Sequence, residues 1–254
     1  MRSAIRWVVV GFLIALAPGI ARPAGPTLTV FAAADLAFAF DELVPRFERV
    51  TGAKVTLVLG STGNLATQIE HGAPADVFFA ADQAFVDRLI AQRVLISESR
   101  ALYAQGRLVL ATAKRLGPKL TDLRALLDPR IRHVAIANPE HAPYGRRAEE
   151  ALRAAGIWEM LKPKLVYGEN IRHTLQFVQS GAAEAGLVAL AIANVPEVEW
   201  VLIDASLHAP LNQATAVARW SPQPELGGSF IQFVNGPEGR AIMKRYGFLL
   251  PGEF

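Results

Sequence analysis

The sequence contains no cysteine, which excludes several kinds of structure at once. Without thiols the chain has no disulfide bonds, no thiolate metal site, no cysteine nucleophile and no lipid-modified N-terminal cysteine. A hydrophobic core must therefore stabilise the fold. The chain has 254 residues, of which 52% are hydrophobic, and this is enough to build a large core.

Long apolar segments are also scarce. Residues 7–16 form an apolar run, but this run is shorter than the roughly 20 residues that a membrane-spanning helix needs. It follows Arg2 and Arg6 and precedes small residues and prolines, which is the order of a secretory signal peptide. We therefore expect residues 1–24 to be a cleaved signal peptide and the mature protein to be soluble and periplasmic.

The mature chain should carry no excess of charge. The formal net charge is +3, but three of the 26 basic residues, Arg2, Arg6 and Arg22, lie in the expected leader, and the remainder equal the 23 acidic residues in number. A balanced charge removes the main attraction to nucleic acid or to an acidic membrane surface. We expect no nucleic-acid partner, so any specificity for an anion must come from a local site.

Motifs for metal binding and catalysis are missing as well. The five histidines show no compact metal-ligand spacing, so we expect no divalent cation site and no cofactor, and we expect His141 and His173 to be solvated surface residues. Ser61 lies between a predicted strand and a predicted helix, as a hydrolase nucleophile does, but the Gly-x-Ser-x-Gly motif is absent and no histidine can be assigned as its base. A secreted serine hydrolase is thus a distant alternative, and we expect that the protein is not an enzyme.

The mature sequence alternates short β-rich runs with helical patterns, which predicts an α/β fold with parallel sheets. The predicted strands cover residues 28–33, 55–60, 76–80, 108–113, 134–137, 164–167 and 185–190. Helical patterns follow the first three of these strands and recur at residues 122–127, 145–155, 171–179 and, as two helices, after Pro224. Residues 211–219 alternate in the manner of an exposed or hinge strand.

Three strand-to-helix junctions in the first half are small and polar, namely residues 32–35, 60–64 and 80–82. Such junctions converge at the carboxyl ends of the strands in a doubly wound sheet, where ligands bind. Small residues let backbone N–H groups approach a ligand, and each following helix adds the positive end of its dipole. The junctions therefore predict an anion site. Ordinary helix capping explains residues 60–64 as well, and it is compatible with anion binding because the same N–H groups are involved.

A second set of junctions lies in the other half of the chain. Residues 138–145 open one predicted helix and residues 168–172 open another, with Asn170 as a plausible N-cap. Tyr144 lies where its hydroxyl group could donate a hydrogen bond to a ligand. Two lobes that each offer helix N-termini would form a cleft.

Four segments resemble the periplasmic molybdate-binding proteins of ABC transporters: residues 29–35, 60–82, 138–145 and 236–248. The resemblance covers essentially the whole mature chain. It implies the type II periplasmic binding protein fold, in which two lobes, each a mostly parallel sheet flanked by helices, enclose the ligand cleft. We expect residues 25–105 and 221–254 to form lobe 1 and residues 106–220 to form lobe 2.

The resemblance also implies a function. The protein would capture molybdate or tungstate with neutral hydrogen-bond donors and deliver it, as a monomer without a cofactor, to an ABC transporter permease. The alternative is the same fold with phosphate, sulfate or an organic anion as its ligand. The residues that match the ligand-binding positions of the family are Ala34, Asp35, Ser61, Thr62, Ala81, Tyr144 and Ile171.

Two positions depart from the family pattern. Members of the family commonly carry a hydroxyl residue where this chain has Asp35, and a carboxylate that faces a dianion is costly. Either Asp35 caps a helix and only its backbone N–H meets the ligand, or its side chain selects a protonated oxyanion such as hydrogen phosphate. Some relatives also place a tyrosine where this chain has Ala189, and Tyr144 would compensate for that loss.

Overall fold

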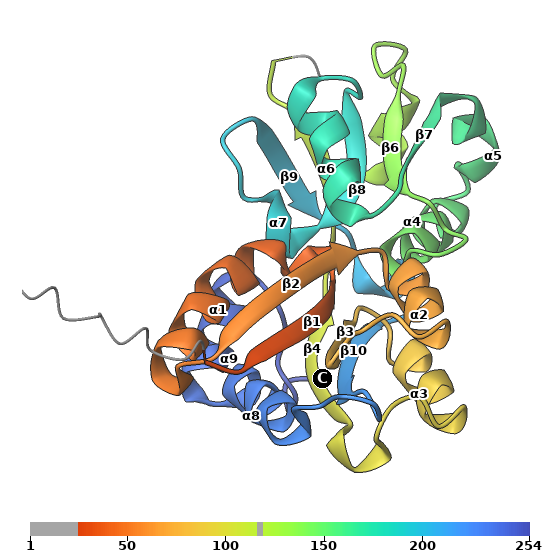
Figure 1. The fold of residues 1–254 in the computed structure, drawn as a ribbon. Coiled ribbons are helices and arrows are strands. Elements are labelled where there is room, and N and C mark those ends of the chain that lie inside the picture. The colour runs from red at the N-terminus through yellow and green to blue at the C-terminus, as the bar shows by residue number, and fades with distance from the viewer. Residues whose placement is uncertain (1–24, 116–118) are drawn as a thin grey trace, which may run out of the picture.

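The computed structural model describes residues 25–115 and 119–254, so the expected signal peptide, residues 1–24, lies outside the described part. These residues fold into two lobes, one above the other in Figure 1, and each lobe is built on a five-stranded sheet with helices packed on it. The prediction of a two-lobed α/β fold is confirmed.

The sheet of the first lobe has the strand order β2-β1-β3-β10-β4. Strand β1 (Thr27–Ala33) pairs in parallel with β2 (Lys54–Gly60) on one side and β3 (Val77–Ala80) on the other. Strand β10 (Leu211–Val217) runs antiparallel to both β3 and β4 (Ala101–Gly106).

The sheet of the second lobe repeats this plan with the order β7-β6-β8-β5-β9. Strand β6 (Val134–Ala137) pairs in parallel with β7 (Leu165–Gly168) and β8 (Ala185–Ala189). Strand β5 (Leu108–Ala113) runs antiparallel between β8 and β9 (Val198–Leu202). In each sheet four strands run in one direction and a single strand, β10 or β5, runs antiparallel to them, so each sheet is mostly parallel as predicted.

The antiparallel strands follow from how the chain crosses between the lobes. Strands β1, β2 and β3 end toward the second lobe, so β10, which enters the first lobe from the second after β9, must run the other way. The predicted lobe 2, residues 106–220, included β10, but the pairing of β10 with β3 and β4 puts residues 211–217 in the first lobe. Of the two alternatives for this segment, the exposed strand is wrong, because β10 is a central strand with nearly all of its residues buried.

Helices cover both faces of the first sheet. The period-2 alternation of β1 explains this, because Leu28 and Val30 face one hydrophobic cluster and Phe31 faces another. The first cluster is covered by α1 (Ala37–Thr51), α8 (Pro224–Asn235) and α9 (Pro237–Arg245). The second is covered by α2 (Thr62–Glu70) and α3 (Gln83–Ala91).

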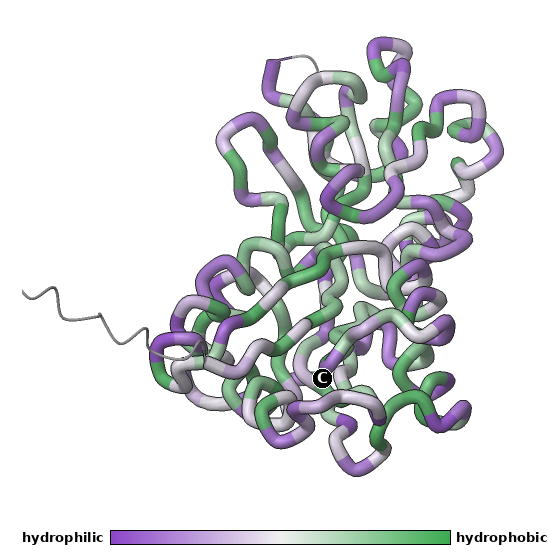
Figure 2. The backbone as a smooth tube through the Cα atoms, viewed as in Figure 1, coloured by the Kyte–Doolittle hydropathy of each residue, from purple (hydrophilic) through white to green (hydrophobic). Residues whose placement is uncertain are grey.

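The helices of the second lobe are α4 (Pro143–Ala154), α5 (Trp158–Leu161), α6 (Ile171–Ser180) and α7 (Leu190–Ala193). Short 3-10 helices are η1 (Ala34–Leu36), η2 (Ser97–Ser99), η3 (Leu123–Leu127), η4 (Lys162–Lys164) and η5 (Ala205–Leu207). Hydrophobic segments follow the strands inside both lobes, and hydrophilic ones lie mainly in the outer loops (Figure 2). Within the described ranges, no helix combines the length and apolar character needed to cross a membrane.

Aromatic side chains fill the centre of the first lobe. Phe79 of β3 makes edge-to-face contacts with Phe40, Phe230 and Tyr103, at ring-centroid distances of 5.1, 5.6 and 5.1 Å. It is fully buried. This ring thus joins one strand to two helices and to β4, and it holds the strand end that leads to Ala81.

We expect Phe79→Ala to lower the free energy of unfolding by about 3–5 kcal/mol, because it leaves a cavity among these rings. Phe254→Ala is the control, since this phenylalanine is 42% exposed, and it should change stability by less than about 0.5 kcal/mol. Urea denaturation followed by circular dichroism measures both. Equal stability of the two variants would contradict the assignment of this core.

Candidate functional site

Five strand-to-helix junctions meet where the two lobes touch. In the first lobe β1, β2 and β3 lead into η1, α2 and α3, and in the second lobe β6 and β7 lead into α4 and α6. A small cavity of about 10 Å³ lies between them. All seven residues predicted for the site line it, namely Ala34, Asp35, Ser61, Thr62, Ala81, Tyr144 and Ile171. The structure thus brings together every predicted residue, and their contacts with a ligand stay a prediction.

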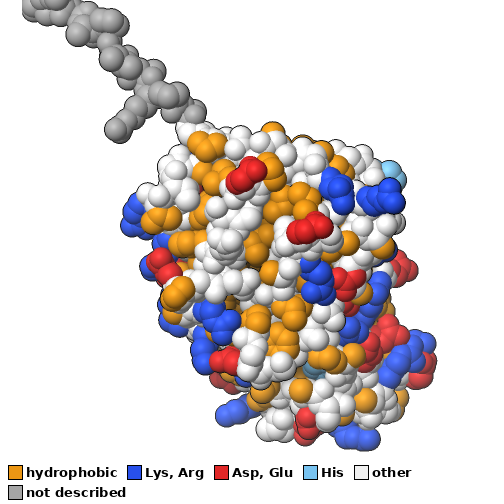
Figure 3. Space-filling view, turned by 90° about the horizontal axis from the view of Figure 1, so that it is seen from below, with side chains coloured by type: hydrophobic (Ala, Val, Ile, Leu, Met, Phe, Trp, Pro, Cys, Tyr) orange, Lys and Arg blue, Asp and Glu red, His pale blue; other side chains and the backbone are white. Residues whose placement is uncertain are grey.

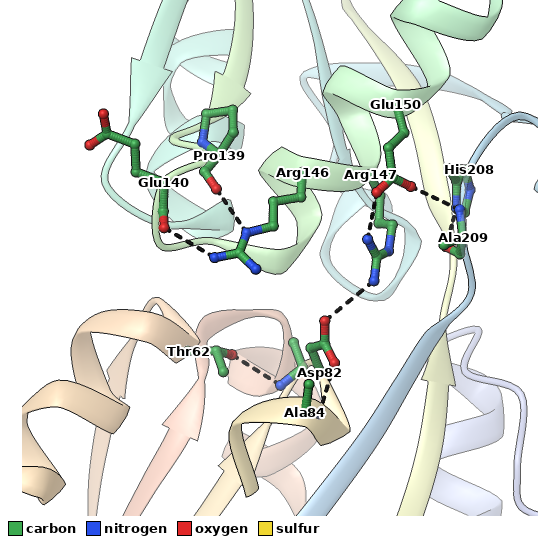
Figure 4. A network of polar contacts seen from close by, with 11 residues as sticks. Thr62, Asp82, Ala84, Pro139, Glu140, Arg146, Arg147, Glu150, His208 and Ala209 are labelled. Atoms are coloured by element: carbon green, nitrogen blue, oxygen red, sulfur yellow. Dashed lines mark hydrogen bonds and ion pairs between the residues drawn. The ribbon is translucent and has the colours of Figure 1, made fainter. Parts of the chain in front are cut away.

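The α2 end of the cavity offers hydroxyl and backbone donors. Ser61 is the N-cap of α2, and its Oγ accepts a hydrogen bond from the Asn64 N–H at 3.4 Å. The Thr62 Oγ1 accepts from the Ala81 N–H at 3.0 Å (Figure 4). Because a hydroxyl group can accept and donate at once, this contact leaves the Thr62 proton available to a group in the cavity.

The second lobe offers two helix N-termini. The Asn170 Oδ1 accepts hydrogen bonds from the N–H groups of Arg172 and His173, both at 3.0 Å. This cap does not bond to the N–H of Ile171. Helix α4 starts at Pro143, and its N-cap Ala142 supplies no side-chain cap. The positive ends of both helix dipoles therefore face the cavity without a charged cap from their N-cap residues.

Asp35 carries the only carboxyl group among the described residues that line the cavity. Its side chain is buried, with 1% of the residue exposed. The Oδ2 atom accepts hydrogen bonds from the Gln213 Nε2 at 2.7 Å and from the Tyr144 hydroxyl at 3.0 Å, while Oδ1 has no hydrogen-bond partner among the described residues. The side chain thus bonds to α4 and β10, and whether only its backbone N–H meets a ligand stays a prediction.

Burial raises the pKa of the Asp35 carboxyl to about 6, although the hydrogen bonds from Gln213 and Tyr144 act in the opposite direction. Burial also raises the pKa of Tyr144 well above its usual value, and the nearby Asp35 charge adds to this effect. The same two causes raise the pKa of Tyr103, whose hydroxyl donates to the Ala80 carbonyl at 3.2 Å. Both tyrosines are therefore neutral donors at physiological pH.

His141 lies at the contact between the lobes, although the sequence predicted a solvated surface residue. Its backbone carbonyl accepts from the Gly63 N–H at 2.8 Å, and its Nδ1 lies 2.8 Å from the Ser61 Oγ. His173 is half-buried against Phe177, with the ring centroids 4.5 Å apart. The loop that holds His141 is thus bound to the start of α2, which closes one side of the cavity.

Arginines of α4 add contacts to the first lobe. The Arg147 Nη2 lies 3.3 Å from the Asp82 Oδ2, and its Nη1 lies 2.7 Å from Glu150 on its own helix (Figure 4). The guanidinium carbon of Arg146 lies 5.6 Å from the centre of the Phe85 ring of α3. These contacts hold the lobes together beside the cavity, not within it.

Two glycines allow the lobes to come this close. A Cβ atom at Gly63 would lie 2.6 Å from the His141 carbonyl oxygen. A Cβ atom at Gly106, the last residue of β4, would collide with the Tyr144 hydroxyl. Glycine at both positions therefore permits contact between backbone and the opposite lobe.

Asp35 is the only acidic or basic residue among the described residues that line the cavity. In the ranges 25–115 and 119–254, no group of three or more His, Cys, Asp or Glu side chains could hold a metal ion. Basic and acidic side chains are scattered among one another on the face of the first lobe that is turned away from the second (Figure 3). The preference for an anion would have to come from the neutral N–H and O–H donors of the cavity.

Sequence reasoning missed Gln213 as a member of the site. It is fully buried on β10, and it donates to Asp35 from a strand that the sequence assigned to the other lobe. Its Oε1 has no hydrogen-bond partner among the described residues. The sequence signal for it was a polar residue within an otherwise apolar run, Leu211–Val217.

Comparison with known proteins gives consistent matches. Residues 28–249 match the family described as bacterial extracellular solute-binding protein. The chain is 32% identical over 239 residues to the molybdate-binding protein ModA of Rhodobacter capsulatus, covering 93% of this chain and 94% of that one. It is 26% identical over 226 residues to the putative ABC transporter substrate-binding lipoprotein YvgL of Bacillus subtilis, covering 87% and 86%. Among solved structures, the periplasmic molybdate-binding protein of Azotobacter vinelandii is similar, with a TM-score of 0.82 and 31% identity over 88% of this chain and 99% of that one.

The raised pKa of Asp35 has a consequence for stability. A carboxyl group with a higher pKa in the folded state binds its proton more tightly there, so folding is favoured at low pH and loses this contribution as the pH rises from about 4 to about 6. The loss is about 3 kcal/mol for a shift of this size. We expect Asp35→Asn, which removes the buried charge, to gain stability relative to the natural protein by up to this amount between pH 4 and pH 8.

Urea denaturation at several pH values measures this difference. Asp41→Asn, at an exposed position on α1, is the control, and its difference from the natural protein should not change with pH in the same way. A constant difference for Asp35→Asn across the range would contradict the raised pKa of this buried carboxyl group.

Proposed function

Because this chain belongs to the bacterial extracellular solute-binding protein family, we propose that it captures molybdate outside the cytoplasm and delivers it to an ABC transporter permease. The cavity between the lobes is the observation that carries this proposal, because five strand-to-helix junctions surround it with hydroxyl groups and helix N-termini. The resemblance to molybdate-binding proteins over nearly the whole chain supports the same ligand. The protein is thus a binding protein and not an enzyme.

The donors are suited to a small oxyanion. Thr62 and Tyr144 supply hydroxyl groups from opposite lobes, and the N-termini of α2, α4 and α6 supply backbone N–H groups. These donors are neutral and fixed by the fold, so they bind an anion without bringing a buried cation with them. The backbone N–H of Ala81 acts indirectly, because it donates to Thr62 and so orients the hydroxyl group.

Capture would proceed by closure of the lobes. The chain crosses between them at Arg107 and again at residues 203–210, and these two connections are the natural hinge. A ligand that contacts both lobes favours the closed form, in which His141 meets Ser61 and Gly63. The permease would recognise this closed form. Since one chain provides both walls of the cavity, we propose that the protein acts as a monomer in the periplasm.

Tungstate is proposed as a second ligand, because it is nearly equal to molybdate in size and charge. Phosphate is the competing candidate, and the unpartnered Oδ1 of Asp35 is the observation that favours it, since this atom could accept the proton of hydrogen phosphate. Sulfate carries no such proton at neutral pH. Titration with these four anions therefore distinguishes the candidate ligands of the cavity.

We expect calorimetric titration of ligand-free protein to show tight binding of molybdate and tungstate and weak binding of sulfate and phosphate. At about a thousand times its dissociation constant, a ligand that binds only the folded state adds roughly 4 kcal/mol of stability, so thermal unfolding provides a second readout. A response to phosphate alone would mean that the ligand is a protonated oxyanion and not molybdate. No response to any of the four anions would refute the proposal.

We expect Thr62→Val to weaken molybdate binding roughly 10- to 100-fold, because it keeps the shape of the side chain but removes a hydrogen bond to a charged ligand. Thr62→Ser should restore most of the affinity, since it retains the hydroxyl group. Thr67→Val is the matched control on the exposed side of the same helix and should bind as the natural protein does. Calorimetry measures all three, and unchanged affinity in Thr62→Val would remove this hydroxyl group from the site.

A further inference from the structure

The Asp35 carboxyl is placed to meet a ligand with one oxygen atom. Its Oδ2 is occupied by hydrogen bonds from Tyr144 and Gln213, at 3.0 and 2.7 Å. Its Oδ1 is buried, has no hydrogen-bond partner among the described residues, and belongs to a residue that lines the cavity. A buried oxygen atom without a partner is costly, so Oδ1 is the atom to which a ligand would bring a hydrogen bond.

No described cation balances the carboxylate. In the ranges 25–115 and 119–254, neither an ion pair nor a hydrogen bond joins Asp35 to a lysine, arginine or histidine. The groups that do face it, Tyr144 of α4, Tyr103 of β4 and Gln213 of β10, are uncharged at physiological pH. An ionised Asp35 beside an oxyanion would therefore place like charges together in a site of low dielectric constant.

The other elements packed against η1 do not supply a counter-charge. The Arg172 guanidinium of α6 lies over the Phe38 ring, 5.8 Å from its centre, and His173 of the same helix stacks on Phe177. Helix α7, Leu190–Ala193, has no titratable side chain, and Asp41 of α1 is exposed. The proton itself is the remaining way to neutralise the site.

On this ground, and resting on the proposed function, we propose that the protein takes up one proton with each oxyanion, and that this proton lies in a hydrogen bond between Asp35 Oδ1 and a ligand oxygen atom. The proton comes from solvent, and no covalent bond to the ligand is formed or broken. The site would then be proton-coupled, with Asp35 as a ligand-contacting residue that determines specificity.

The pH dependence of the affinity follows. The pKa of Asp35 in the empty site is about 6, and the charge of a bound oxyanion raises it further. Below about pH 6 the empty site already holds the proton, so the affinity should not depend on pH there. Above that value each pH unit should weaken binding about tenfold, because one proton must be taken from solvent.

The first test is the natural protein titrated with sodium molybdate at pH 7.5 in buffers of different ionisation enthalpy. The dependence of the observed heat on the buffer gives the number of protons taken up, and we expect about one per molybdate. The dissociation constant should rise about tenfold per unit between pH 6.5 and 8.5. Tight binding without proton uptake would overturn this inference and leave the proposed function intact.

Two variants and a control locate the proton. Asp35→Asn offers an N–H donor without a titrating group, so its affinity should be independent of pH and its proton uptake should fall to zero. His141→Gln should keep the uptake of about one proton, and Asp41→Asn should behave as the natural protein. Uptake that persists in Asp35→Asn or disappears in His141→Gln would assign the proton to another group and overturn the inference.

Failure of the proposed function gives a different result. If neither the natural protein nor Asp35→Asn binds molybdate at any pH, the ligand is wrong and so is this inference. Thermal unfolding of each variant establishes that it is folded. If Asp35→Asn does not fold, the proton count and pH slope of the natural protein, together with His141→Gln, still decide the question.

Discussion

The direction of five strands determines most of what this protein can do. Strands β1, β2 and β3 of one sheet and β6 and β7 of the other all end at the contact between the lobes, and each is followed by a helix that starts there. Helix N-termini carry partial positive charge and unpaired N–H groups, so their convergence creates an anion site without any cationic side chain. The antiparallel strands β5 and β10 follow from the same constraint, because the chain has to return from that contact.

Much of the fold could be predicted because local sequence dictates it. The alternation in β1 and the helical spacing of Leu36, Phe40, Leu43 and Phe47 are properties of the chain itself, and both appear in the structure. Strands β4 and β9 were missed because their residues, Ala101–Gly106 and Val198–Leu202, become strands through pairing with distant partners. The lobe assignment of β10 failed for the same reason, because the local sequence does not determine which sheet a strand joins.

In the candidate site, too, the residues that local sequence reveals differ from those that depend on distant contacts. Residues at strand-to-helix junctions, such as Ser61, Thr62 and Ile171, could be found because such junctions have small, polar sequences and a known position in doubly wound sheets. Gln213 and His141 could not, because Gln213 lies within a strand and His141 acts partly through its backbone carbonyl. Sequence also pointed to Asp35 as unusual but could not name its partners, because they come from α4 and β10, which are distant in the chain.

A buried carboxyl group in an anion site looks like a contradiction, and the hydrogen bonds resolve it. The Tyr144 hydroxyl group has a single proton, which it can give to Asp35 or to a ligand but not to both. If the Tyr144 hydroxyl donates its hydrogen bond to a ligand instead, Asp35 Oδ2 keeps only the hydrogen bond from Gln213. The ionised form of Asp35 then becomes still less favourable. A ligand and a proton are then bound together more readily than either alone, since each removes an obstacle to the other. This coupling needs only neutral donors, the burial of one carboxyl group and the close approach that glycine allows at position 106.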